Sequence, residues 1–105
     1  MVINQNQVLR EIKDTVMAIE PNATIILYGS RARGDYRDDS DIDLIILIDK
    51  EDITREDEIK ITYPIYDIEF KTTASISPMV YSKKAWANHK ITPFYENVLH
   101  DGKII

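Results

Sequence analysis

The sequence predicts one small α+β domain that spans residues 1–105. Two patterns lead to this prediction. Apolar residues recur at helical spacing near the amino terminus, and short apolar runs rich in β-branched residues follow them, as is typical of buried strands. The length of 105 residues is that of a single domain. With 44% apolar and 30% charged residues, the composition is that of a folded globular protein rather than a disordered one.

The first element is an amphipathic helix over residues 6–19. Val8, Ile12 and Val16 recur at a spacing of four, which places them on one helix face. Pro21 then ends the pattern, because proline is a poor continuation of a helix. We expect this face to pack on the core.

Two strands and a loop are expected next. Residues 23–28 form a short apolar run that Gly29 ends, which favours a buried strand. Residues 30–40 are polar and predict a turn and a loop. Residues 41–48 (DIDLIILI) are rich in β-branched and apolar side chains and predict a second, central strand.

The stretch from 54 to 73 fits two templates. Apolar residues recur at helical spacings of four, three and four: Ile59, Tyr63, Tyr66 and Phe70. Residues 66–70 also alternate apolar and acidic side chains, as on a strand. Thr54 is a good helix N-cap, whereas Pro64 would kink a helix interior or open a second helical segment. We favour a helix over 54–73.

The last third predicts a strand and two helices. Residues 74–81 (ASISPMVY) are typical of a third strand, and Pro78 places this strand near an edge or a bulge. Residues 82–88 begin with a serine cap and predict a short helix. Residues 92–102 begin with a Thr-Pro pair and end with glycine, which predicts a final helix. Its expected core-facing residues are Phe94, Val98 and Leu99.

Composition excludes several classes of protein. The absence of cysteine excludes disulfides, thiolate nucleophiles and cysteine zinc sites. A net charge of −5 is a poor match for a protein that coats nucleic acid, so no stable nucleic-acid binding is expected. No apolar run approaches the roughly 20 residues of a membrane span. The polar start after Met1 shows no signal peptide, so we expect a cytoplasmic protein without a membrane partner.

The chemistry lies between residues 28 and 47 (YGSRARGDYRDDSDIDLIIL). On a strand, Asp41 and Asp43 would share one face, about 7 Å apart along the backbone. Unpaired carboxylates in such a place must be solvated, paired with cations or bound to metal. A hard divalent cation such as Mg²⁺, held by one or two carboxylates and by substrate phosphates, meets that demand. The aspartate pair therefore predicts a magnesium site.

The Gly29-Ser30 pair that ends the preceding strand predicts a phosphate site. Glycine allows close backbone approach, serine offers a hydroxyl, and the amides that open the next turn can donate to phosphate oxygens. Arg31 and Arg33 could neutralise further oxygens, or could instead pair with acidic residues of the loop, namely Asp35, Asp38 and Asp39. A triphosphate between this turn and metal ions on the two aspartates would support phosphoryl or nucleotidyl transfer.

Gly29-Ser30, ten further residues and Asp41-Ile42-Asp43 resemble the signature of the DNA polymerase β-like nucleotidyltransferase superfamily. GSRARG followed by SDIDL is similar to its minimal nucleotidyltransferase (MNT) subgroup. The resemblance covers about 20 residues strictly, and the length and closing DGKII are also similar to stand-alone members, so the chain is expected to be complete. It implies a nucleotidyltransferase fold with a small mixed sheet and flanking helices, ATP as substrate and two Mg²⁺ ions. It further implies that Gly29 and Ser30 contact the triphosphate and that Asp41 and Asp43 are the catalytic metal ligands, with Arg33 added as a nucleotide-binding candidate.

The resemblance also implies a partner. Many minimal members are antitoxins of HEPN-domain toxins, and some attach AMP to a tyrosine of the toxin. The expected function is therefore AMP transfer from ATP to a hydroxyl of a HEPN-type toxin; the alternative is a non-catalytic antitoxin that acts by occlusion.

One departure from the superfamily concerns its usual third carboxylate, which comes from a later strand. Residues 75–77 contain no acid if the strand over 74–81 supplies that position. Asp67 or Glu69 could serve if residues 66–70 form the strand instead.

Overall fold

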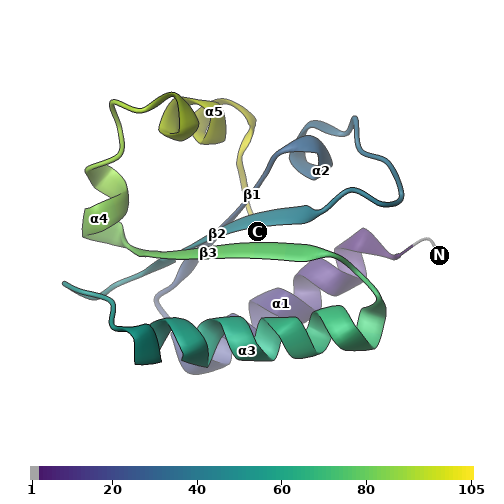
Figure 1. Cartoon of the computed structure of the whole chain (residues 1–105), viewed down its shortest axis with the longest axis horizontal. Coiled ribbons are helices and arrows are strands. Elements are labelled where there is room, and N and C mark those ends of the chain that lie inside the picture. Colours follow the sequence, from purple (N-terminus) through teal and green to yellow (C-terminus); the bar gives the residue numbers. More distant parts are fainter. Residues whose placement is uncertain (1–2) are drawn as a thin grey trace.

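A computed structural model, which describes residues 3–105, shows a four-stranded mixed sheet in the order β3-β2-β1-β4 with helices on both faces (Figure 1). The elements are α1 (Gln5–Ile19), β1 (Thr24–Tyr28), α2 (Ser30–Arg33), β2 (Ile42–Ile48), α3 (Arg55–Thr72), β3 (Ile76–Ser82), α4 (Lys83–Ala87), α5 (Pro93–Asp101) and β4 (Lys103–Ile104). The predicted α+β class, with a mixed sheet and flanking helices, is confirmed.

Strand β2 lies inside the sheet, as expected. It pairs antiparallel with β1 and parallel with β3. Because side chains alternate along a strand, its two apolar sets point to opposite faces. Ile42, Leu44, Ile46 and Ile48 belong to the larger core cluster, whereas Ile45 and Leu47 belong to the smaller one. Asp43 shares the face of this second set.

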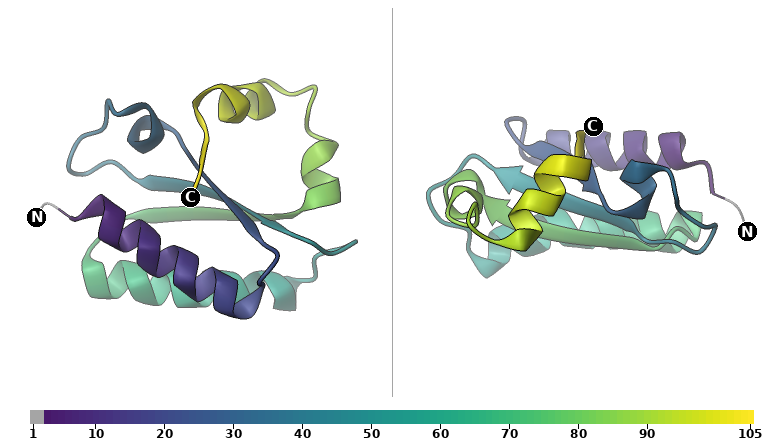
Figure 2. Two further views of the ribbon diagram at one scale, coloured as in Figure 1. Left: turned by 180° about the vertical axis from the view of Figure 1, so that it is seen from behind. Right: turned by 90° about the horizontal axis from the view of Figure 1, so that it is seen from above.

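Helices α1 and α3 lie side by side on one face of the sheet (Figures 1 and 2). The predicted apolar stripe of α1 is confirmed, since Val8, Ile12 and Val16 are buried. Thr54 caps α3 as predicted, in a capping box with Asp57. These two helices cover the larger core.

The details of α3 differ from prediction in two ways. The helix runs through Pro64 without ending, and the strand alternative over 66–70 is wrong. In addition, three of the four residues whose spacing indicated the helix, Tyr63, Tyr66 and Phe70, are exposed, whereas Ile61 and Ile65 are buried. The sequence carries two apolar stripes on this helix, and the aliphatic one packs against the sheet.

The second face is covered by α4 and α5. Trp86 of α4 and Val98 of α5 pack on Ile45 and Leu47. Ser82 and Thr92 cap these helices as predicted, and Pro93 is the first residue of α5. Leu99 does not face the core, because α5 places it on the outer side and leaves it 65% exposed.

Several boundaries also differ from prediction. The polar segment 30–40 contains the one-turn helix α2. Strand β3 covers Ile76–Ser82 rather than 74–81, and its place at the sheet edge is confirmed. Strand β4, which pairs antiparallel with β1, was not predicted, because two residues are too few to show a period. Within residues 3–105, no helix is long and apolar enough to cross a bilayer.

Candidate active site

The candidate residues meet where β1 ends and β2 and β3 begin. Asp43 lies opposite Tyr28 of β1 and opposite Ser77 of β3. Helix α2 follows β1 directly and lies at this end of the sheet (Figure 1). The antiparallel pairing of β1 with β2 therefore brings the Gly-Ser turn to the Asp-x-Asp segment.

Gly29 and Asp43 are in close contact. Gly29 has a φ of +75°, and a Cβ atom added there would lie 2.5 Å from Asp43 Oδ2. Because an L side chain would have both an unfavourable backbone angle and a clash with this carboxylate, only glycine fits. The Asp43 carboxylate thus lies directly against the turn that the sequence predicts to bind phosphate.

The charge of Asp43 is poorly compensated in the folded chain. Its partial burial raises the pKa of the Asp43 carboxyl, and the neighbouring negative charge of Asp41 raises that pKa further. Within residues 3–105, neither aspartate forms an ion pair with a basic side chain. Burial also raises the pKa of the Tyr28 hydroxyl, with a smaller contribution from Asp43. Two adjacent, unpaired carboxylates are a donor set that fits a divalent cation.

Asp41 lies just before β2 rather than on it, which corrects the predicted strand start. The first backbone bond of this strand to the β3 side runs from Ile42 N to Ser75 O, 2.7 Å away. The side chain of Asp41 is exposed, and its Oδ1 accepts a 2.5 Å hydrogen bond from Ser75 Oγ. Asp41 is therefore a loop residue that is held on one side by the start of the sheet.

Ser30 begins the single turn of α2. The amides of Ala32 and Arg33 donate to Gly29 O at 3.1 Å. The two earlier amides of the turn, those of Ser30 and Arg31, precede the first helical hydrogen bond and so have no carbonyl partner within the turn. These are the amides that the sequence predicts as phosphate donors.

The two arginines of the motif have different environments. Arg33 is exposed and pairs with Asp35 and with Asp101 of α5, each at 3.3 Å, so one of the acidic partners expected for it is present. Arg31 is buried, with 5% of its surface exposed, and contacts the loop that precedes Asp41. Only Arg33 is thus accessible to a ligand.

Neither candidate for the third carboxylate reaches this site. Asp67 and Glu69 lie on α3, which covers the opposite face of the sheet from Asp43. Glu69 Oε2 accepts a 2.6 Å hydrogen bond from Ile76 N. Opposite Asp43 on β3 stands Ser77, which bears no charge. In the part of the chain that the structure describes, no group of three or more His, Asp or Glu residues is arranged to hold a metal.

Two polar neighbours of the aspartates were not identified from the sequence as site residues. Ser75 bonds Asp41, and Tyr28 lies beside Asp43 in the sheet. These neighbours are identified by the strand register, which pairs Asp43 with Tyr28 on β1 and with Ser77 on β3. Sequence periodicity alone does not supply that register.

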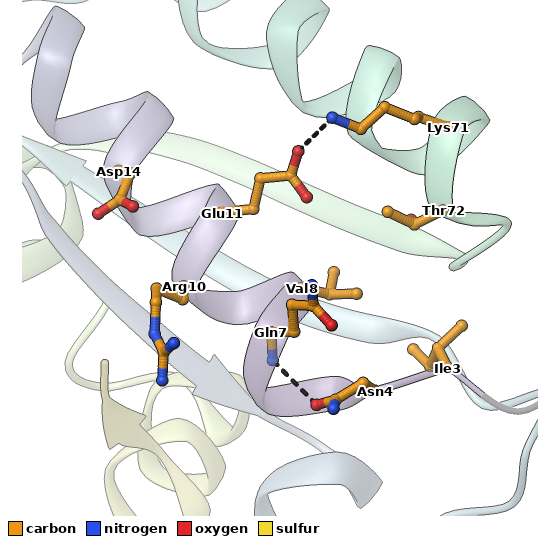
Figure 3. A pocket seen from close by; sticks show the side chains of 9 residues that line it. All are labelled: Ile3, Asn4, Gln7, Val8, Arg10, Glu11, Asp14, Lys71 and Thr72. Carbon is orange, nitrogen blue, oxygen red and sulfur yellow. Dashed lines mark hydrogen bonds and ion pairs between the residues drawn. The ribbon is translucent and has the colours of Figure 1, made fainter.

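A hollow on the surface lies between the start of α1 and the end of α3 (Figure 3). An ion pair of 2.6 Å between Lys71 and Glu11 bridges its two helices. Because α1 and α3 cover the face opposite Asp43, this hollow is separate from the candidate site.

Comparisons with known proteins show to which family the chain is related. The model of the nucleotidyltransferase domain family matches residues 9–93. A putative protein adenylyltransferase of Methanocaldococcus jannaschii is 35% identical over 79 residues, which cover 73% of this chain and 79% of that protein.

Two solved structures share the fold at 18% identity. A toxin–antitoxin crystal structure with AMP-PNP has a TM-score of 0.59 and is matched over 97% of this chain and 72% of its own. A mutant of the MntA–HpeT toxin–antitoxin pair has a TM-score of 0.58, over 98% of this chain and 72% of its own.

The family match covers most of the chain and includes the Gly-Ser turn, the Asp43 carboxylate that contacts it, and Asp41. The chain is therefore a nucleotidyltransferase and belongs to the nucleotidyltransferase domain family.

Proposed function

We propose that this protein is a magnesium-dependent adenylyltransferase that moves AMP from ATP to a tyrosine hydroxyl of a HEPN-type toxin and so acts as its antitoxin. One observation carries the proposal: the Asp43 carboxylate lies against Gly29. This contact supports the proposal, because a carboxylate that could bind a metal lies beside a turn whose amides could bind phosphate. The similarity to a putative protein adenylyltransferase supports a protein acceptor, and the fold shared with toxin–antitoxin structures supports a toxin as that acceptor.

In this proposal the triphosphate lies along the turn that starts α2. The amides of Ser30 and Arg31 and the hydroxyl of Ser30 donate to phosphate oxygens, and the bare Gly29 backbone allows their approach. Arg33 is available as well, because exposed ion pairs such as those with Asp35 and Asp101 contribute little and can be exchanged for a phosphate.

Asp41 and Asp43 are the proposed metal ligands. Their uncompensated charges fit Mg²⁺, which needs only one or two protein carboxylates when phosphate and water supply the other oxygens. Two bound Mg²⁺ ions would orient the α-phosphate and stabilise charge on the attacking and leaving oxygens. The protein's part is to hold both carboxylates at the end of β1, where the turn presents the triphosphate.

The reaction is an in-line displacement at the α-phosphorus. The acceptor oxygen forms a bond to this phosphorus, the bond to the β-phosphate oxygen breaks, and pyrophosphate leaves. The hydroxyl proton is released to solvent, since no third carboxylate among residues 3–105 faces Asp43.

Labelled ATP tests the proposal. The full chain is incubated with Mg²⁺, ATP labelled at the α-phosphate and the protein encoded beside it. We expect label on that protein from α-labelled but not from γ-labelled ATP, and a loss of about 100-fold or more in Asp43→Asn, because this change removes a direct metal ligand. Asp67→Asn, on the opposite face, serves as the isosteric control. Transfer that persists in Asp43→Asn would refute the assignment.

The uncharged Ser77 opposite Asp43 favours one alternative, a non-catalytic antitoxin that occludes its partner. The Asp41→Asn, Asp43→Asn double variant separates the two functions. If catalysis is required, this variant fails to neutralise the toxin. If occlusion is sufficient, it neutralises as well as the unaltered chain.

A further inference from the structure

The residue of interest is Arg31, a buried arginine with no acidic partner among residues 3–105. Burying a guanidinium is costly unless its donors are satisfied. Here the acceptors are all neutral oxygens, and three of the four belong to the backbone. Arg31 thus binds backbone carbonyl groups and forms no ion pair among residues 3–105.

The contacts of Arg31 gather one loop. Its Nε donates to Ser40 O at 2.8 Å, and its Nη2 donates to Arg37 O at 3.3 Å and Asp38 O at 3.2 Å. The Tyr36 ring lies 4.6 Å from its Cζ, within cation–π range. The loop from 36 to 40 therefore wraps around a single side chain.

Helix α1 holds the guanidinium from the other side. Arg31 Nη1 donates to Gln5 Oε1 at 3.1 Å, and Gln5 Nε2 donates to Arg31 O at 3.5 Å. These bonds link Arg31, and through it the loop, to the first residue of α1.

The bond to Ser40 is the one that lies next to Asp41 along the chain. Ser40 O belongs to the peptide that joins Ser40 to Asp41, so the 2.8 Å bond from Arg31 Nε orients the peptide immediately before a proposed metal ligand. On its other side, Asp41 is held by Ser75 and by the first bond of the sheet at Ile42. Asp43, in contrast, is held by strands on both sides.

We propose that Arg31 is a positioning residue that acts through Asp41: its buried guanidinium fixes the loop that presents this carboxylate to the metal. The inference rests on the proposed metal site. It differs from the phosphate contact that the sequence also allowed for Arg31, because a buried side chain engaged with four oxygens is not free to bind a nucleotide.

Binding of Mn²⁺ alone to the full chain, followed by electron paramagnetic resonance, tests this without activity. We expect Arg31→Met to weaken Mn²⁺ binding about tenfold or more, as is typical when the support of a metal ligand is lost. Amide hydrogen exchange in residues 37–41 should quicken. Arg10→Met, at an exposed arginine of α1, is the matched control and should change neither.

A double-mutant cycle shows whether the effect passes through Asp41. In an Asp41→Asn background, Arg31→Met should cost little further Mn²⁺ affinity, whereas in an Asp43→Asn background its cost should remain. Additive effects in both backgrounds would overturn the proposal, as would equal Mn²⁺ affinity of the unaltered chain and Arg31→Met. If Arg31→Met does not fold, Arg31→Lys and Gln5→Ala take its place, because each removes only some of the hydrogen bonds of Arg31. Both variants should also weaken Mn²⁺ binding.

This test is independent of the proposed reaction. Failure of the unaltered chain to transfer AMP would refute adenylyl transfer, while the Mn²⁺ cycle would still decide the role of Arg31. An Arg31 variant with a raised KM for ATP and unchanged Mn²⁺ affinity would instead identify a nucleotide ligand and contradict our inference.

Discussion

Among single residues, two local contacts hold the aspartates of the candidate site. Gly29 leaves room for the Asp43 carboxylate, and Ser75 bonds the side chain of Asp41. Each contact holds a carboxylate that forms no ion pair with a basic side chain among residues 3–105. The candidate site therefore depends on Gly29 and Ser75, which hold the carboxylates, as well as on the two aspartates themselves.

A pair of glycines tests the contact at Gly29. Gly29→Ala should lower transferase activity about 100-fold or more, because the new Cβ would displace the Asp43 carboxylate from its place. Gly34→Ala is the matched control. Gly34 also has a positive φ of +92°, but a Cβ there would meet nothing within 4 Å.

Both glycine variants should lose stability through backbone strain, by about 1–2 kcal/mol for Gly34→Ala. Only Gly29→Ala should lose activity, measured below the unfolding temperature of both variants. Equal activity of the two would show that Asp43 does not need the space at Gly29.

At the scale of the element, α3 carries two apolar stripes and buries only one. The aliphatic stripe of Ile61, Ile65 and Ile68 packs on the sheet, and the aromatic stripe of Tyr63, Tyr66 and Phe70 faces outward. Both stripes have helical spacing, so periodicity predicts the helix but not its rotation. The aliphatic stripe is the buried one because its branched side chains pack closely in one core with Leu44, Ile46 and the apolar residues of α1.

Substitutions on each stripe check this orientation. Ile65→Ala should cost about 2–5 kcal/mol of unfolding free energy, because it leaves a cavity in the core. Phe70→Ala, at a side chain that is 91% exposed, should change stability by no more than about 0.5 kcal/mol. Urea unfolding measures both. A large loss in Phe70→Ala together with a small one in Ile65→Ala would mean that the helix is rotated.

At the scale of the whole molecule, the sheet separates stability from chemistry. One face carries the larger core under α1 and α3, while Asp43 lies on the other face, at the end of the sheet opposite to α4. A charged group can stand there because the main core does not depend on that position. The protein nevertheless loses some stability to its own site, as is common where function requires unpaired charge.

The pH dependence of stability should reveal that loss. The raised pKa of Asp43 means that the folded chain binds this proton more tightly than the unfolded chain does. Binding of this proton stabilises the folded chain. The stabilisation is complete at a pH below 3.8, the ordinary pKa of an aspartate, and is lost as the pH rises through the raised pKa of Asp43. In metal-free solution, Asp43→Asn should therefore be more stable than the unaltered chain at pH near 7, and this advantage should vanish at low pH.

Urea unfolding in the presence of a chelator, repeated across pH, measures the difference. Asp67→Asn is the control, because Asp67 is exposed on the opposite face. Added Mg²⁺ should stabilise the unaltered chain and not Asp43→Asn. An Asp43→Asn variant that is less stable at neutral pH would contradict the account of a partly buried, uncompensated charge.

Local patterns in the sequence are enough to predict the class of the fold, the helix caps at Thr54 and Thr92, and the two motifs to which we assign the chemistry. All of these features can be recognised from the spacing of residues within one short segment. The contact between Gly29 and Asp43, the bonds from Arg31 to the loop before Asp41, and the position of α3 on the far face become visible only in the folded chain. The physical reason is that strand order and register bring together residues that are distant along the chain, and no local period encodes which strands will be neighbours.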